Sequence, residues 1–160
     1  MRLRESHSLP VPLAAAWAAS NDVGLLQRAL PGCELLVEIA RDEFVGEMAV
    51  PMGLATHRFT IYIHRRDVEA PRRCTLHFET RTAGSNGIGS AALQLTPDGS
   101  VATRLQVDIE VQIDGVVGVL GAPLIELAAH EMARQFFEGL RALAVARVNV
   151  ARTGANANMP

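Results

Sequence analysis

The longest regular pattern of apolar and polar positions lies near the end of the chain, between about residues 120 and 147. Apolar residues recur there three or four positions apart, which is typical of one long helix with a buried and a solvated face. The buried face is predicted to carry Ile125, Ala129, Met132, Phe136, Leu140 and Leu143, and the solvated face Glu126, His130, Arg134, Glu138 and Arg141. A helix of about 25 residues spans roughly 37 Å, so it must cross most of a small domain.

Before this helix, apolar and polar residues mainly alternate, which predicts strands whose two faces meet different surroundings. A first strand is expected at residues 2–9, followed by short helices at 12–20 and 22–30. Six more strands are expected between Glu34 and Ile113, joined by turn residues into consecutive antiparallel hairpins. Their inward positions are predicted to be Leu35, Val37 and Ile39; Phe44, Gly46, Met48 and Val50; His57, Phe59, Ile61 and Ile63; Cys74, Leu76 and Phe78; Ala91, Leu93 and Leu95; and Leu105, Val107, Ile109, Val111 and Ile113.

This order of elements predicts an α+β helix-grip fold, in which a seven-stranded antiparallel sheet curls around the long C-terminal helix. Where a curled sheet and a helix diverge, we expect an apolar cavity that binds a ligand. Its predicted lining is Trp17, Leu26, Met48, His57, Phe59, Ile61, Leu76, Phe78, Leu93, Val107, Ile109, Met132 and Phe136. One domain is expected at residues 1–147, followed by a flexible tail at 148–160, because the final residues lack apolar content.

Composition excludes several classes of function. The net charge of −2 does not provide the basic surface that nucleic-acid binding requires. All fifteen basic residues are arginine, which excludes Schiff-base chemistry on lysine. The chain has no apolar run near 18 residues and no leader pattern, so a cytoplasmic location is expected. Cys33 and Cys74 lack metal-ligand spacing and are predicted to be free thiols.

The polar residues with candidate chemistry are few, and no nucleophile–base pattern or metal-ligand cluster is present in the sequence. His57 shares the inward parity of Phe59 and Ile61, so it is either a hydrogen-bonding group of the cavity or a histidine at its rim. Trp17 is either a packing anchor of its helix or part of the lining. The other histidines considered, His77 and His130, are predicted to be solvated.

Four arginines bracket one predicted hairpin tip: Arg65, Arg66, Arg72 and Arg73. Such a local basic patch suits docking to an acidic partner surface or to anionic lipid headgroups. The alternative is a solvated turn that prevents an edge strand from pairing.

Several stretches have residues similar to those of one known family. They are the Trp17 helix after a proline, Leu30-Pro31-Gly32-Cys33-Glu34, Phe44–Val50, Pro71-Arg72-Arg73 with the strand after it, Leu95–Leu105, and Met132-Ala133 followed by Gln135-Phe136-Phe137. Over residues 1–143 the chain resembles the carbon monoxide dehydrogenase G-subunit family of the SRPBCC or START-like superfamily. The resemblance implies a helix-grip fold with an apolar cavity, and a role in the assembly, membrane association or quinone supply of molybdenum hydroxylases.

The sequence departs from that family in two features. The chain ends within about thirteen residues of its predicted helix, which weakens the expectation of a membrane anchor, and Ile61 stands where many members have a small residue, which predicts a narrower cavity. We therefore expect a non-catalytic accessory protein of a molybdenum hydroxylase that binds a quinone-like ligand and needs no other cofactor. The alternatives are an enzyme of the cyclase or aromatase kind, with His57 or Tyr62 as acid or base, and an assembly factor with a filled core.

Overall fold

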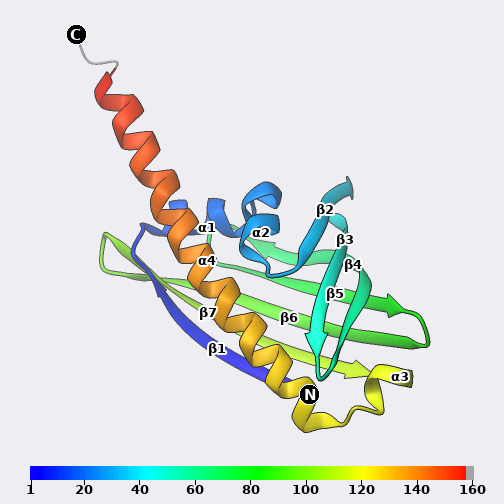
Figure 1. The fold of residues 1–160 in the computed structure, drawn as a ribbon. Helices are drawn as coiled ribbons and strands as arrows, with labels where there is room; N and C mark the ends of the chain where they lie inside the picture. The colour runs from blue at the N-terminus through cyan, green and yellow to red at the C-terminus, as the bar shows by residue number, and fades with distance from the viewer. Residues whose placement is uncertain (158–160) are drawn as a thin grey trace.

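The computed structural model describes residues 1–157 and has the predicted architecture: a seven-stranded antiparallel sheet with all helices on one face (Figure 1). The strands are β1 (Arg2–Leu9), β2 (Cys33–Ala40), β3 (Glu43–Met52), β4 (Ala55–Glu69), β5 (Arg73–Thr82), β6 (Ser85–Asp98) and β7 (Ala102–Ile113). The helices are α1 (Leu13–Ser20), α2 (Val23–Ala29), α3 (Gly115–Gly118) and α4 (Ala122–Ala157). The predicted helix-grip fold is confirmed.

The sheet has the order β1-β7-β6-β5-β4-β3-β2, so the first strand pairs with the last and β2 forms the other edge. Residues directly opposite each other in an antiparallel pair point to the same face. Rows such as Ile63–Phe78–Gly89 therefore define one face across several strands. We call the face that the helices cover the inner face, and the opposite face the outer face.

Local sequence determines how α1 and α2 reach the inner face. α1 begins after Pro12, and the Asp22 side chain caps α2 by accepting a hydrogen bond of 2.9 Å from the Leu25 amide. Arg147 of α4 donates to the same Asp22 carboxylate at 2.9 Å. The two short helices thereby pack between α4 and the sheet (Figure 1).

The buried apolar residues form two separate clusters along α4. The first cluster joins β1, β6, β7, α1, α2 and the middle of α4, and its most buried large residues are Leu9, Leu95, Leu105 and Leu140. The second cluster lies toward the beginning of α4 and contains Val50, Met52 and Val117, with Met48, Phe59, Ile113, Ala128 and Met132 packed against them. The fold is thus filled at two places rather than evenly.

The predicted inward parity of β2 is wrong. Leu36 is buried, with 7% exposure, whereas Leu35, Val37 and Ile39 are exposed on the outer face. A register shift between Cys33 and Leu35 changes which residues point inward, and the Leu36 amide donates to Gln27 of α2 at 3.2 Å. Contact with α2 therefore fixes a parity that the apolar pattern of this strand left ambiguous.

The predicted end of the last helix near Arg147 is also wrong, because α4 continues to Ala157 and projects beyond the sheet (Figure 1). Residues 149–156 are exposed and helical, where a flexible tail was expected. Ala151, Arg152 and Ala155 favour helix in this extension, but Gly154 and two asparagines do not, so intrinsic propensity alone does not explain it. A domain boundary at residue 147 stays a prediction, and residues 158–160 lie outside the described part of the chain.

Candidate ligand-binding surface

An apolar strip separates the two buried clusters on the inner face. On β7, Ile109 packs against the first cluster and Ile113 against the second, while Val111 between them belongs to neither. The same holds on other elements, and we define the open strip as Phe44, Ile61, Ile63, Val111, Ile125 and Ala129. All six side chains are partly exposed although they lie on the covered face or on α4.

The path of α4 over the sheet explains why this strip is not closed. The backbone of α4 comes within 8 Å of β1 on one side and of β3 on the other, but stays mostly farther from the four strands between them. A curled sheet and a straight helix diverge in this way, and apolar surface between them is the usual place for a ligand. The open strip is therefore our candidate ligand-binding surface.

Two strand glycines allow neighbouring large side chains to lie close to the sheet beneath this surface. A Cβ atom on Gly89 would lie 2.7 Å from Cζ of Phe78, so the Phe78 ring occupies the space above Gly89. A Cβ atom on Gly46 would lie 2.9 Å from Cγ2 of Ile61. Both large side chains therefore lie flat against a neighbouring strand instead of standing up toward α4.

The residues predicted to line the cavity are distributed over both clusters and the strip. Of these residues, Ile61 lies in the strip, Val107 is buried in the first cluster, and Leu26 of α2 is partly buried. Packed against the first cluster are Trp17, Leu76, Phe78, Leu93, Ile109 and Phe136, and against the second Met48, Phe59 and Met132. The predicted residues surround the strip, but Val107 is part of the filled core. Their role in binding a ligand stays a prediction.

His57 occupies an inward position of β4 directly opposite Val50 of the second cluster. Its Nε2 atom is shut off from solvent and has no hydrogen-bond partner, and it is the one buried side-chain nitrogen or oxygen of residues 1–157 in that condition. A buried polar atom without a partner is uncommon and costs stability.

A polar seam, which the sequence reasoning missed, joins β1 to α4. The Glu5 carboxylate lies 3.1 Å from His7 Nε2 and 3.6 Å from Nδ1 of His130, and the His7 ring stacks on Phe137 at 3.9 Å. His130 was expected to be solvated, and its side chain is 61% exposed while still reaching Glu5. Glu5 and His7 share the inward parity of Leu3 and Leu9, and polar residues at that parity were the available sequence signal.

The basic patch at the β4–β5 turn is smaller than predicted, because Arg65 points to the inner face. Arg65 is only 21% exposed, donates to Asp42 at 2.8 Å and to Asn21 at 2.5 Å, and lies over the Phe44 ring. Arg73 pairs with Glu69 at 2.7 Å and lowers the pKa of that carboxyl group. The four arginines therefore do not form one exposed patch, and Arg66 and Arg72 are the members left exposed without an ion pair in the described chain.

Tyr62, an acid or base in the enzyme alternative, lies on the outer face. Its ring is exposed and Arg81 lies over it at 5.4 Å. Adjacent strand residues point to opposite faces, so Tyr62 faces away from the strip that contains Ile61. It therefore cannot act on a ligand bound at the inner face.

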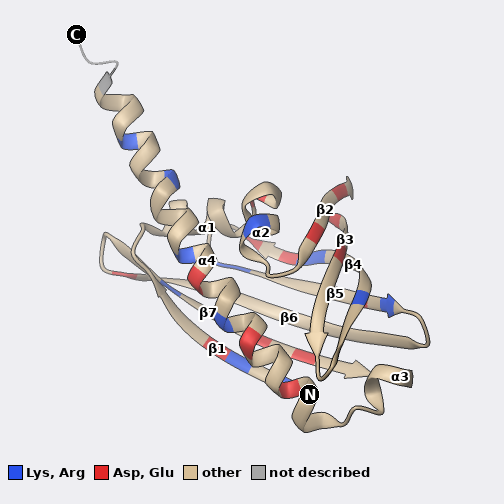
Figure 2. Ribbon diagram, viewed as in Figure 1, with Lys and Arg blue, Asp and Glu red and all other residues tan. Residues whose placement is uncertain are grey.

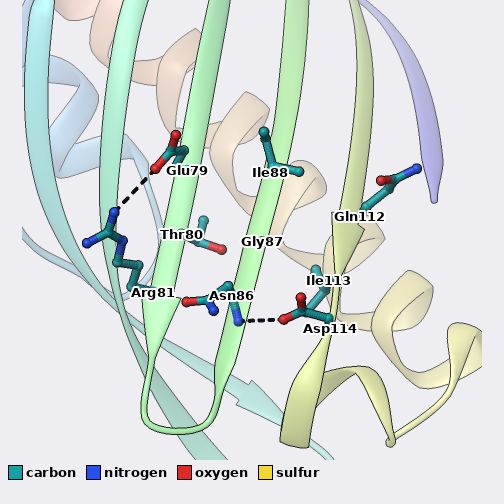
Figure 3. A pocket seen from close by; sticks show the side chains of 9 residues that line it. All are labelled: Glu79, Thr80, Arg81, Asn86, Gly87, Ile88, Gln112, Ile113 and Asp114. Atoms are coloured by element: carbon teal, nitrogen blue, oxygen red, sulfur yellow. Dashed lines mark hydrogen bonds and ion pairs between the residues drawn. The ribbon is translucent and has the colours of Figure 1, made fainter.

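The outer face carries a depression of about 620 Å³ over β5, β6 and β7 (Figure 3). Its charged groups already have partners: Arg81 lies 3.5 Å from Glu79, and Asp114 accepts from the Asn86 amide at 3.0 Å. Because it is open to solvent and polar, it suits an apolar ligand less well than the inner strip does.

Other kinds of site have little support in the described chain. Burial raises the pKa of both cysteine thiols, which disfavours a nucleophilic thiolate. No group of three histidine, cysteine or acidic residues within the described chain could hold a metal ion. Within residues 1–157, no helix combines the length and the apolar composition that crossing a membrane requires.

Large apolar side chains are exposed at the end of the molecule beside the second cluster. They come from the β3–β4 hairpin, α3 and the beginning of α4, and are Leu54, Val116, Val119, Leu120 and Leu127. α3 and the first turn of α4 carry no charged residue (Figure 2). Met52 and Val117 of the second cluster lie in the same segments, so the apolar interior and the apolar surface adjoin.

Comparison with known proteins agrees with the fold and with the sequence resemblance. The family model for the G subunit of carbon monoxide dehydrogenase (CoxG) matches residues 6–145. A conserved protein from Geobacillus kaustophilus has a similar structure, with a TM-score of 0.85 and 17% identity over 91% of this chain and 96% of that one.

Two further structures have the same fold. A START superfamily protein from Mycobacterium smegmatis has a TM-score of 0.71 and 11% identity, with 91% and 97% of the two chains covered. The Zhui aromatase/cyclase from Streptomyces sp. R1128 has a TM-score of 0.67 and 15% identity, with 92% and 95% covered. No curated protein matches the chain. The family model, which spans most of the chain, confirms the resemblance read from the sequence.

Proposed function

Because this chain belongs to the CoxG family of carbon monoxide dehydrogenase G subunits, we propose that it is a non-catalytic carrier of a quinone-like ligand. It binds this lipophilic ligand on the open strip between α4 and the sheet. It acts in the cytoplasm as an accessory protein of a molybdenum hydroxylase of the carbon monoxide dehydrogenase type.

The observation that carries this proposal is the open strip itself. Protein interiors are close-packed, and a helix that covers a sheet normally buries the apolar residues beneath it. Here Ile61, Ile63 and Val111 stay partly exposed between two filled clusters. Covering such surface with an apolar ligand gains about 25 cal/mol for each Å² removed from water, so binding there is favourable.

The accessory role predicts a contact with the partner enzyme, and the exposed arginines Arg66 and Arg72 are the proposed contact. Two arginines on an acidic protein attract an acidic surface mainly at low salt, because exposed charges act over about 8 Å at physiological ionic strength. In a pull-down at low salt, changing both to serine should weaken the retention of the hydroxylase, whereas Arg152→Ser on the projecting end of α4 should not.

Binding of 2-methyl-1,4-naphthoquinone, measured by equilibrium dialysis, tests the carrier proposal. Ile61→Trp places a larger ring in the strip and should weaken binding at least tenfold. Tyr62→Trp adds the same ring on the outer face of the same strand and should leave binding unchanged. Circular dichroism spectra of both variants establish that they are folded.

The other outcomes would overturn the proposal. A wild-type protein that binds no quinone probe, and yields no apolar molecule on extraction with organic solvent, would be an assembly factor with a filled core. Turnover of a polyketide-like substrate would make it an enzyme. One structural neighbour, the Streptomyces protein, is named as an aromatase/cyclase.

A further inference from the structure

We propose that His57 holds the polar end of the ligand, so that the protein selects lipophilic molecules that carry a ketone or hydroxyl oxygen. This inference rests on the proposed carrier function and names the class of ligand that the same surface takes. It also gives the ligand a direction, with its oxygen at the second cluster and its apolar part along the open strip.

The first support is the condition of the His57 Nε2 atom. Buried polar atoms in folded proteins nearly always have a hydrogen-bond partner, and the exceptions are often functional. Within the described chain, this nitrogen is the one buried side-chain nitrogen or oxygen without one. His57 shares the inner face with Phe59 and Ile61, so it lies at the second-cluster end of the strip, with Phe59 between it and Ile61.

The second support is the composition of the cluster beside His57. Met48, Met52 and Met132 belong to or pack against the second cluster, and they are three of the five methionines in the chain. Methionine is unbranched and flexible, and adapts to differently shaped partners. These side chains can therefore move aside and let a ligand oxygen reach Nε2. The first cluster contains several leucines in place of methionines, and it should adapt less to a ligand.

The chemistry of the surroundings selects the class of ligand. A neutral imidazole nitrogen donates to a carbonyl or accepts from a hydroxyl, depending on its tautomer, so both the quinone and the quinol forms of a ligand satisfy it. The side chains of the second cluster are apolar and offer a ligand oxygen no hydrogen bond, so His57 is the polar group beside it that can provide one. Hydrocarbons without oxygen leave the nitrogen unpaired.

The chain at the end of the molecule near the second cluster carries few charges. Residues 51–56, which include Leu54, and residues 115–125, which include Val119, contain no charged side chain (Figure 2). A lipophilic molecule approaching from this end loses little water from polar groups before it reaches the inner face.

The test compares two probes with the same ring skeleton, 2-methyl-1,4-naphthoquinone and 2-methylnaphthalene, in wild type and in His57→Phe. Phenylalanine keeps an aromatic ring at this position but removes both imidazole nitrogens. Affinity for the quinone should fall about tenfold, the effect of losing one hydrogen bond, and affinity for the hydrocarbon should stay within about twofold. His64→Phe, an exposed histidine of the same strand on the outer face, is the matched control and should change neither affinity.

A second measurement separates an anchor from a packing residue. Removing an unpaired buried nitrogen should leave the thermal midpoint of ligand-free His57→Phe equal to or above that of the wild type. His57→Gln, which restores a donor and an acceptor, should recover part of the selectivity for the quinone.

The outcomes are distinguishable. If both probes bind the wild type and His57→Phe weakens both equally, or lowers the thermal midpoint, His57 is a packing residue and the inference is overturned while the carrier stands. An unchanged ratio of the two affinities also overturns it, because the partner of Nε2 is then water. If neither probe binds the wild type, the proposed function itself fails.

Discussion

Phe136 and Phe137 are consecutive residues of α4 in different surroundings, and they test which side of this helix is buried. Consecutive helical residues point roughly 100° apart, so both cannot occupy the centre of the same face. Phe137 is 5% exposed and stacks on His7, whereas Phe136 is partly buried and meets the Phe137 ring edge-on at 5.1 Å. The structure therefore moves the centre of the buried face from Phe136, predicted from the sequence, to Phe137.

The expected costs follow from this difference in burial. Truncating a buried phenylalanine to alanine typically costs about 3–5 kcal/mol, and Phe137→Ala should lie in this range because it also loses the stacking on His7. Phe136→Ala should cost about half as much, since part of its ring is already in water. For a domain of this size, about 2–4 °C of thermal midpoint is lost per kcal/mol, so Phe137→Ala should lower it by about 10 °C and Phe136→Ala by about 5 °C.

Denaturant titration and thermal unfolding, followed by circular dichroism, measure both values. Arg141→Ala, at an exposed position one turn beyond Phe137 on α4, is the control and should change the free energy of unfolding by no more than about 0.5 kcal/mol. A Phe136→Ala shift equal to or larger than the Phe137→Ala shift would refute the assignment of the helix face.

Two further predictions concern titratable groups. A hydrogen bond of 2.6 Å from Arg134 lowers the pKa of Glu131 from 4.5 to about 2, so the stabilisation from this carboxylate is present above pH 4.5 and is lost as the pH falls through about 2. Arg134→Ala should return the pKa of Glu131 toward 4.5 in an NMR titration, and an unchanged value would exclude this pairing in solution. Burial raises the pKa of both thiols, and Cys74 is the more deeply buried, so iodoacetamide at about pH 8 should alkylate Cys33 first and Cys74 only after unfolding. Equal rates for the two thiols would contradict the described burial.

Much of the fold could be predicted because its signals are local. The alternation at Leu105–Ile113 and the turn residues between strands are short-range patterns, and they determined the meander and its faces. β2 shows the limit of such patterns. Its sequence places apolar residues at both parities, Leu35 and Leu36, and a contact with α2 from outside the strand decides between them.

The candidate site was less accessible from sequence, because its properties depend on which residues meet in three dimensions. The inward parity of His57 was predictable, but the missing partner of its Nε2 atom was not. The seam of Glu5, His7 and His130 joins the first strand to the last helix, and Arg65 turned out to bind Asn21 and Asp42 rather than solvent. Pairings over such sequence distances leave no periodic signal.

Glycines at inward strand positions are the sequence signal that could have located this surface. Gly46 and Gly89 lie in the middle of β3 and β6, where a glycine costs roughly 0.5–1 kcal/mol relative to alanine. Each lies beneath a large side chain, Ile61 or Phe78, that occupies the space of the missing Cβ atom. A larger residue would be crowded at both positions, because a Cβ atom on Gly89 would also overlap the backbone oxygen of Glu110, and one on Gly46 would lie 3.2 Å from that of Leu35. The flattened side chains leave the inner face low beneath α4, and glycine in a strand often marks a place where a ligand approaches closely. Close packing of neighbouring strands therefore requires these glycines, and the flat side chains beside them agree with the strip that the two clusters leave open.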